Sequence, residues 1–157
     1  MKIGVISDSH DNQPKIKKAV EVFNKQKVEL VLHAGDFVAP FSLIPFDYLN
    51  CEYLGVFGNN DGERQGLTEK SGGRIKEGPQ IIYRVSKTII LAHDIKQVDL
   101  KNQSAHLVIC GHTHRTLAHM EGSTLWLNPG ESGGWLTGIS TIAVVDINTL
   151  SYQIINI

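Results

Sequence analysis

The feature that most constrains this chain is an apolar run that ends in a glycine and two histidines. Leu107–Cys110 is short and continuously apolar, which predicts a buried strand, and Gly111 ends it. His112 and His114 follow, and in a continuing strand their rings would point to opposite faces. Because glycine tolerates backbone angles that other residues avoid, we expect the chain to leave the strand path there, so that both imidazoles converge on one spot at the strand's carboxyl end. Two exposed loop histidines are the alternative, which this stretch alone does not exclude.

The carboxyl end of a strand is where α/β sheets place their ligands, and imidazole is the commonest metal ligand among protein side chains. Four other predicted strands, at residues 2–7, 30–33, 53–57 and 88–92, end in side chains of matching chemistry. These are Asp8 and His10, then Asp36, then Asn59 with Asn60 and Asp61, and then His93. The recurrence favours one shared site over a set of unrelated turn residues.

The pattern between these strand ends predicts one α/β domain over residues 1–157. A helix is expected from Pro14, and a strand–helix–strand unit of this length makes the first two strands parallel. Short helices are expected at 40–49 and 95–103, and the glycine-rich stretch 62–79 is expected to be a surface excursion.

The second half of the chain predicts mainly antiparallel strands. Residues 80–85 and 88–92 are separated by two residues, which predicts a hairpin. Further strands are expected at 116–121, 125–127, 141–147 and 151–155. Two packed mixed sheets with helices outside would bury all of these elements.

Composition narrows the classes of partner. The formal net charge of -1 gives no global basic field, and no stretch indicates specific nucleic-acid binding. The apolar run after Met1 and Lys2 is too short for a signal peptide or a membrane span. Cys51 and Cys110 are far apart and form no CxxC motif, so we expect reduced thiols in a cytoplasmic protein.

The strand-end side chains together indicate a metal site. Carboxylate, imidazole and amide donors suit Mn, Fe, Zn or Co rather than a thiolate site. Seven candidate ligands exceed what one tetrahedral metal takes, and they fit two metals that share a carboxylate. Two such metals can clamp a phosphoryl group and activate a bridging hydroxide. The candidates are Asp8, His10, Asp36, Asn59, His93, His112 and His114.

Read in order, the motifs Asp-x-His, Gly-Asp, Gly-Asn-x-Asp, an isolated His and Gly-His-x-His resemble the calcineurin-like metallophosphoesterases over essentially the whole chain. The small size, the Gly58–Asp61 motif and the segments 128–132 and 136–139 resemble the compact phosphodiesterase branch. The resemblance implies a four-layer α/β/β/α sandwich and hydrolysis of a phosphodiester. It implies two divalent metals, manganese being our first choice and Ni, Fe, Zn or Co the alternatives.

The resemblance also implies a division of roles among the ligands. Asp36 would bridge the two metals. One metal would be held by Asp8, His10 and His114, and the other by Asn59, His93 and His112.

The sequence departs from the family pattern at two positions. In relatives the isolated His is usually followed by Gly, whereas Asp94 follows His93 here and adds a carboxylate near the second metal. Many relatives have His where Asn60 stands, and that His is commonly assigned to phosphate binding or to protonating the leaving group. Asn60 can bind a phosphate but donates no proton, and His10 is the nearest other imidazole by motif, so Asn60, His10 and Asp36 are the catalytic candidates.

Several residues near these motifs have two interpretations. Arg115 would contact a substrate phosphate or form a solvated ion pair, and His33 is expected to hold local geometry rather than a metal. Asp61 is expected to orient Asn59 or a neighbour. Trp135 and Leu136 would cap the site or form a homo-oligomer interface.

Two functions are compatible with this pattern. The first is a metal-dependent phosphodiesterase. The second is a non-enzymatic interaction scaffold, like the metallophosphoesterase-like subunit of the retromer coat. We favour the enzyme, because a scaffold has no chemical need for seven compatible ligands.

Overall fold

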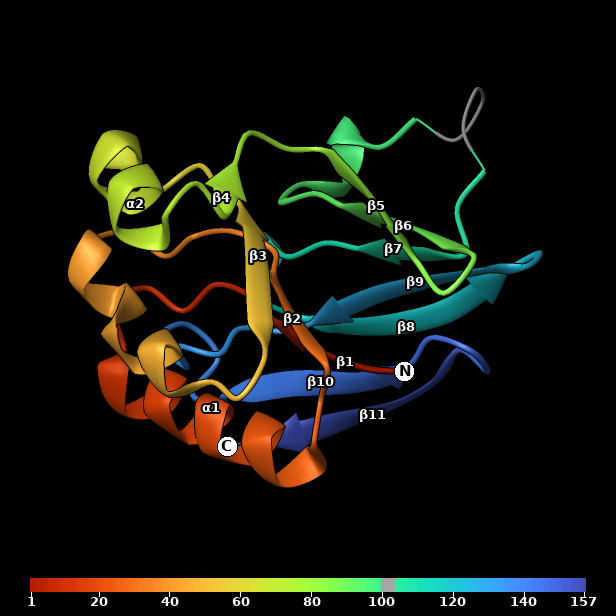
Figure 1. The fold of residues 1–157 in the computed structure, drawn as a ribbon, viewed down its shortest axis with the longest axis horizontal. Coiled ribbons are helices and arrows are strands. Elements are labelled where there is room, and N and C mark those ends of the chain that lie inside the picture. Colours follow the sequence, from red (N-terminus) through yellow and green to blue (C-terminus); the bar gives the residue numbers. More distant parts are fainter. Residues whose placement is uncertain (100–103) are drawn as a thin grey trace.

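The computed structural model describes residues 1–99 and 104–157, which form two facing sheets with helices outside (Figure 1). The helices are α1 (Gln13–Gln26), η1 (Pro40–Tyr48), α2 (Arg64–Ser71) and η2 (Ile95–Gln97), of which η1 and η2 are 3-10 helices. The strands are β1 (Lys2–Ile6), β2 (Leu30–His33), β3 (Glu52–Val56), β4 (Ile75–Lys76), β5 (Gln80–Arg84), β6 (Lys87–Leu91), β7 (Leu107–Ile109), β8 (Thr116–Glu121), β9 (Thr124–Pro129), β10 (Thr141–Asp146) and β11 (Ser151–Asn156).

Both sheets are mixed. The first has the strand order β11-β10-β1-β2-β3-β4, and β1 to β4 run parallel to one another. The second has the order β5-β6-β7-β9-β8, in which β7 is parallel to both of its neighbours. The expectation of a mainly antiparallel second half is therefore wrong for β7. The strands β8 and β9 pair antiparallel as predicted. Of these two strands, β9 is the one next to β7, and it runs in the same direction as β7.

Helix α1 covers the outer face of the first sheet. The Asn12 side chain caps its start by accepting a hydrogen bond from the Lys15 amide, and Pro14 fits the first turn. The apolar stripe of this helix, which includes Phe23, is buried against the outward residues of the sheet. A Cβ on Gly4 would lie 2.6 Å from the Phe23 ring, so a glycine in β1 lets the helix pack closely.

The main core lies between the two sheets. Strand residues alternate between faces, so Ile3 and Val5 point inward while Ile6 points toward α1. Leu30 and Leu32 share the inter-sheet core with β6, β7 and β9 residues. Each fully buried aliphatic side chain here contributes roughly 1.5–3 kcal/mol of transfer free energy.

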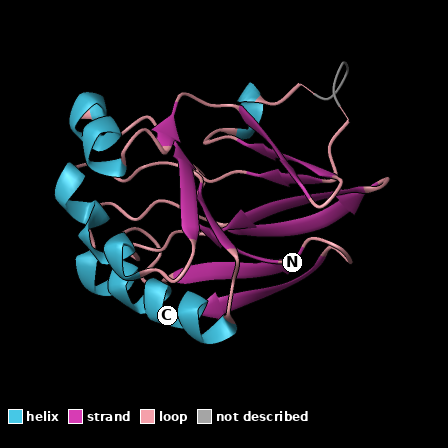
Figure 2. Cartoon of the chain, in the orientation of Figure 1, coloured by secondary structure: helices cyan, strands magenta, loops and turns pink. Residues whose placement is uncertain are grey.

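The predicted four-layer arrangement is confirmed, with a small outer layer on the second sheet. Figure 2 shows α1, η1 and α2 gathered at the first sheet. A third core cluster joins Ile90 and Val108 to Ala105, with Val98 and Trp126 packed against it, so the segment around η2 covers the other sheet. The helix expected at 95–103 is helical at Ile95–Gln97, and residues 100–103 lie outside the described residues.

The excursion at 62–79 contains the short helix α2 and also β4, which pairs with β3 and was not predicted. In the two described ranges, no helix is both long enough and apolar enough to cross a membrane.

Candidate metal centre

The seven predicted ligands lie on loops that follow β1, β2, β3, β6 and β7. Within each sheet backbone bonds join these loops, from the Asp8 amide to the Gly35 carbonyl and from the Gly111 amide to the His93 carbonyl. Between the sheets, the His112 amide donates to the Asp8 carboxylate at 3.1 Å. The carboxyl ends of both sheets therefore meet at one edge of the sandwich, as the sequence predicts.

Left-handed backbone angles aim five of the seven ligands into this edge. The φ values are 50° for Asp8, 40° for His10, 61° for Asp36, 68° for His112 and 60° for His114. Non-glycine residues seldom adopt such angles, and each costs roughly 1–3 kcal/mol where the surroundings impose it. Strain of this kind concentrates at functional sites, which supports a shared role for these turns.

The expected backbone role of Gly111 is wrong. Its φ is not positive, and the left-handed angles fall on the two histidines that follow it. A Cβ on Gly111 would instead collide with the Ser7 hydroxyl and lie 2.7 Å from Asp8 Oδ2. A glycine is needed at position 111 because the loop after β7 lies against the loop after β1. These two loops are distant in the sequence.

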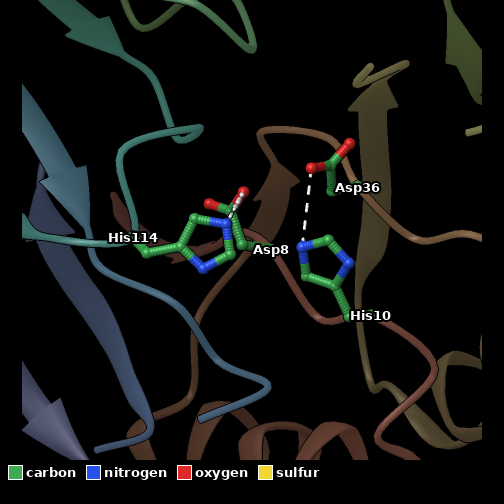
Figure 3. A group of neighbouring side chains, drawn as sticks. All are labelled: Asp8, His10, Asp36 and His114. Atoms are coloured by element: carbon green, nitrogen blue, oxygen red, sulfur yellow. Dashed lines mark ion pairs between the residues drawn. The ribbon is translucent and has the colours of Figure 1, made fainter. Parts of the chain in front are cut away.

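Four ligands form one compact cluster (Figure 3). Donor atoms of Asp8, His10, Asp36 and His114 all lie within 4.8 Å of one another. His114 Nε2 is 3.6 Å from Asp8 Oδ1, and His10 Nε2 is 3.5 Å from Asp36 Oδ2. This is the group that the resemblance assigns to one metal, together with the proposed bridge.

The other three ligands form a second cluster around Asn59. Its Oδ1 is 2.8 Å from His93 Nε2 and 2.9 Å from His112 Nδ1. His93 Nε2 is also 3.4 Å from Asp36 Oδ2. Asp36 therefore lies between the two clusters, and His112 and His114 face different clusters rather than one common point.

The hydrogen bonds of the imidazoles fit bound cations. His93 Nδ1 is 2.7 Å from the Ala34 carbonyl, which can only accept, so Nδ1 carries the proton. In the neutral ring the Nε2 lone pair then faces Asn59 Oδ1 and Asp36 Oδ2, which are also acceptors. His10 Nε2 is buried and has no hydrogen-bond partner among the described residues. Electron pairs that converge in this way need a proton or a metal ion between them.

The carboxylates at the centre are removed from water. Asp8 and Asp36 are 0% and 1% exposed. Burial raises the pKa of the Asp8 carboxyl, and the Ser7 hydroxyl at 2.5 Å opposes that rise. Buried carboxylates are expensive unless they are paired or bind metal, so their burial here fits a site for cations.

Two further side chains hold the loops in place. Asp61 accepts backbone hydrogen bonds from Asp36 at 3.0 Å and from Gly58 at 2.7 Å, so it fixes the bridge loop to the loop that carries the second cluster. His33 Nδ1 accepts from the Gly35 amide at 3.1 Å, and its Nε2 lies 3.0 Å from Ser9 Oγ. Burial lowers the pKa of His33 well below 6.5, so the ring is neutral and, as expected, holds geometry rather than a ligand position.

Glu131 is a residue whose role the sequence analysis missed. Its carboxylate is 0% exposed and lies 2.9 Å from His114 Nδ1. It also accepts from the Leu136 and Thr137 amides and from the Thr137 hydroxyl. Burial alone would raise the pKa of Glu131, but hydrogen bonds from Thr137 and His114 outweigh it and hold the pKa at about 2. In the sequence, the indication of such a role was that Glu131 is the one acidic residue in the glycine-rich segment 130–134.

The remaining predicted residues lie around this centre. Asn60 donates to Asp36 twice, from its backbone and its side-chain amide, each at 2.8 Å. Arg115 is exposed on the loop after His114. Trp135 is 65% exposed, and its indole N–H donates to the His10 carbonyl.

Comparison with known proteins agrees with this geometry. The model of the calcineurin-like phosphoesterase superfamily domain matches residues 1–150. Phosphodiesterase MJ0936 of Methanocaldococcus jannaschii is 39% identical over 162 aligned positions, which cover 98% of this chain and 97% of that protein. The solved structure of an archaeal phosphodiesterase has a TM-score of 0.91 and 36% identity over 100% of both chains.

A more distant structure, the phosphoesterase YfcE of E. coli, has a TM-score of 0.73 at 18% identity over 99% of this chain and 98% of its own, which shows a common fold. The chain belongs to the calcineurin-like phosphoesterase superfamily, as its motifs predict.

Proposed function

We propose that this protein is a metal-dependent phosphodiesterase that holds two divalent metal ions at the carboxyl ends of its sheets. Family membership, the named activity of the 39% identical relative and the Asp/His cluster support this class of enzyme. In the proposal Asp36 bridges the ions. Asp8, His10 and His114 hold one of them, and Asn59, His93 and His112 hold the other.

When bound, the metals supply the positive charge that polarises phosphoryl oxygens and makes water a competent nucleophile near neutral pH. The chain's own residues supply the positions. The Ala34 carbonyl keeps Nδ1 of His93 protonated, and the Glu131 carboxylate does the same for His114. In each ring Nε2 is then free to bind a cation. Asn60 lies beside the bridge, and its amide can donate to a phosphoryl oxygen. We assign Arg115 to a substrate phosphate, because it is exposed directly after a ligand.

The identity of the metal, the cellular compartment and the class of substrate are proposed from the sequence. We propose manganese as the metal. The mixture of oxygen and imidazole nitrogen donors is compatible with manganese, as it is with Fe, Zn or Co, and it contains no thiolate. We propose a cytoplasmic enzyme with a phosphodiester substrate and without specific nucleic-acid binding. Leu136 is 76% exposed beside Trp135, which suits either a cap on the site or a contact between copies of the chain.

The observation that carries this proposal is the convergence of imidazole lone pairs and buried carboxylates on Asp36. The test is elemental analysis after mild loading with Mn²⁺, followed by a panel of natural phosphodiesters. We expect about two equivalents of metal per chain and turnover that a chelator removes. Metal content near zero under these conditions, without turnover, would instead favour the interaction scaffold.

A further inference from the structure

A small cavity opens directly beside the second ligand cluster. It has a volume of about 240 Å³ and lies where the loop after β3, the end of β4 and the start of η2 meet. In Figure 1 the link from β4 to β5 runs along the upper edge of the molecule, and Glu77 and Gly78 of this link line the cavity. The lining residues that carry charge are Arg64, Glu77 and Asp94, and Gln97 adds an amide.

The cavity is continuous with the candidate metal centre, because Asn59, His93 and His112 line both. Pockets that enclose a drug-sized ligand usually measure about 300–1,000 Å³. The smaller volume here fits one substituent of a phosphodiester while its phosphate lies at the metals.

The polar groups of the cavity have partners within the chain. The Arg64 guanidinium lies 5.1 Å from the Phe57 ring centroid, and it donates to the Asp61 carbonyl at 3.2 Å. It also forms an ion pair of 2.6 Å with Glu77, so these two charges offset each other. Asp94 Oδ1 caps η2 by accepting from the Lys96 amide at 3.0 Å.

The other oxygen, Asp94 Oδ2, lies 4.0 Å from Nε2 of the candidate ligand His112. A carboxylate in this position accepts hydrogen bonds from hydroxyl groups and repels a second negative charge.

We propose that this cavity binds the non-reacting alcohol substituent of the phosphodiester and that Asp94 selects an uncharged, hydroxyl-bearing substituent such as a sugar or glycerol. The inference rests on the proposed phosphodiesterase function, and it adds the chemical class of the substrate.

The test uses three diesters that share a p-nitrophenolate leaving group and differ in the retained substituent: methyl, 2,3-dihydroxypropyl and carboxymethyl. For each enzyme, kcat/KM for the second and third diesters is divided by kcat/KM for the methyl diester. Because all three are measured on one preparation, these ratios do not depend on the fraction of protein that carries metal.

Asp94→Asn should lower the dihydroxypropyl ratio by about fivefold, since an amide still accepts a hydrogen bond but a weaker one. It should raise the carboxymethyl ratio, since the repelling charge is gone. Asn caps a helix as well as Asp does, so η2 should persist. The reciprocal variant Gln97→Glu adds a carboxylate to the cavity and should lower the carboxymethyl ratio. Asp47→Asn is the matched control, because it removes an exposed carboxylate that pairs with Lys70 elsewhere.

Opposite shifts of the two ratios in Asp94→Asn, with no shift in the control, would support the assignment. Unchanged ratios, or ratios that move in the same direction, would overturn it while the phosphodiesterase function stands. If the wild-type protein hydrolyses none of the three diesters with any metal, the proposed function fails and this inference fails with it.

Discussion

Replacing Glu131 with glutamine tests whether this buried carboxylate controls a metal ligand. Glu131 Oε2 accepts a hydrogen bond of 2.9 Å from His114 Nδ1, while Oε1 accepts from the amide and the hydroxyl of Thr137. Both oxygens are therefore occupied by donors. Glutamine keeps the shape of the side chain but replaces one of these acceptors with an NH₂ group.

Either orientation of the new amide is unfavourable. If its NH₂ faces His114, Nδ1 must become an acceptor, and the ring proton moves to Nε2, the atom that we propose binds the metal. If its NH₂ faces Thr137, two N–H groups point at each other. Loss of such an orienting partner typically costs 10–100-fold in metal affinity, or about 1.4–2.7 kcal/mol. We therefore expect Glu131→Gln to weaken one of two metal sites by that factor.

The measurement is isothermal titration of metal-free protein with Mn²⁺ at pH 7, together with nitrogen NMR of the histidine tautomers before metal is added. The control is Glu121→Gln, which changes an exposed carboxylate on β8. We expect the NH₂ of glutamine to face His114, because the other orientation would oppose the amides of Leu136 and Thr137. The proton of His114 should therefore lie on Nδ1 in the wild-type protein and on Nε2 in the variant. Unchanged affinity at both sites and an unchanged tautomer would refute the reasoning, and the tautomer result stands even if metal affinity cannot be resolved.

Three further predictions concern the bridge, the leaving group and pH. Asp36→Asn should remain folded and should lose more activity than Asn59→Ala, because Asp36 lies between both ligand clusters. Turnover near the wild-type rate at saturating metal would contradict the assignment of Asp36 as the ligand that the two metals share. Because Asn60 cannot protonate the leaving oxygen, log kcat/KM should fall steeply from nitrophenyl diesters to alkyl diesters, whose leaving groups are more basic. The fall should be less steep in Asn60→His. A shallow fall in the wild-type protein would mean that another group protonates the leaving oxygen. Burial lowers the pKa of His33 below its ordinary value of 6.5, so below about pH 6.5 the unfolded chain binds a proton that the folded chain excludes. The free energy of unfolding should therefore decrease as pH falls through that range, and denaturant unfolding of His33→Gln should show a shallower decrease; equal slopes would contradict the assignment.

The sequence alone determined the family, the enzyme class, the fold class and the positions of the candidate ligands. The family and the enzyme class follow from the resemblance of the ordered motifs to known phosphoesterases. The fold class and the ligand positions follow from local patterns, because an apolar run marks a buried strand and the residues after it must lie at the strand's end. The clustering of Asp8, His10, Asp36 and His114 could be anticipated for that reason. Their assignment to particular metals and the choice of manganese stay predictions.

Other features depend on contacts between distant residues, which local patterns do not encode. Apolar spacing shows that β7 is buried, but strand pairing decides that it lies between β6 and β9 and runs parallel to both. The need for glycine at 111 arises from Ser7 and Asp8, which reach it only after the sheets have packed. The role of Glu131 likewise depends on a return of the chain to His114, because a hydrogen bond forms only where folding brings donor and acceptor within about 3 Å.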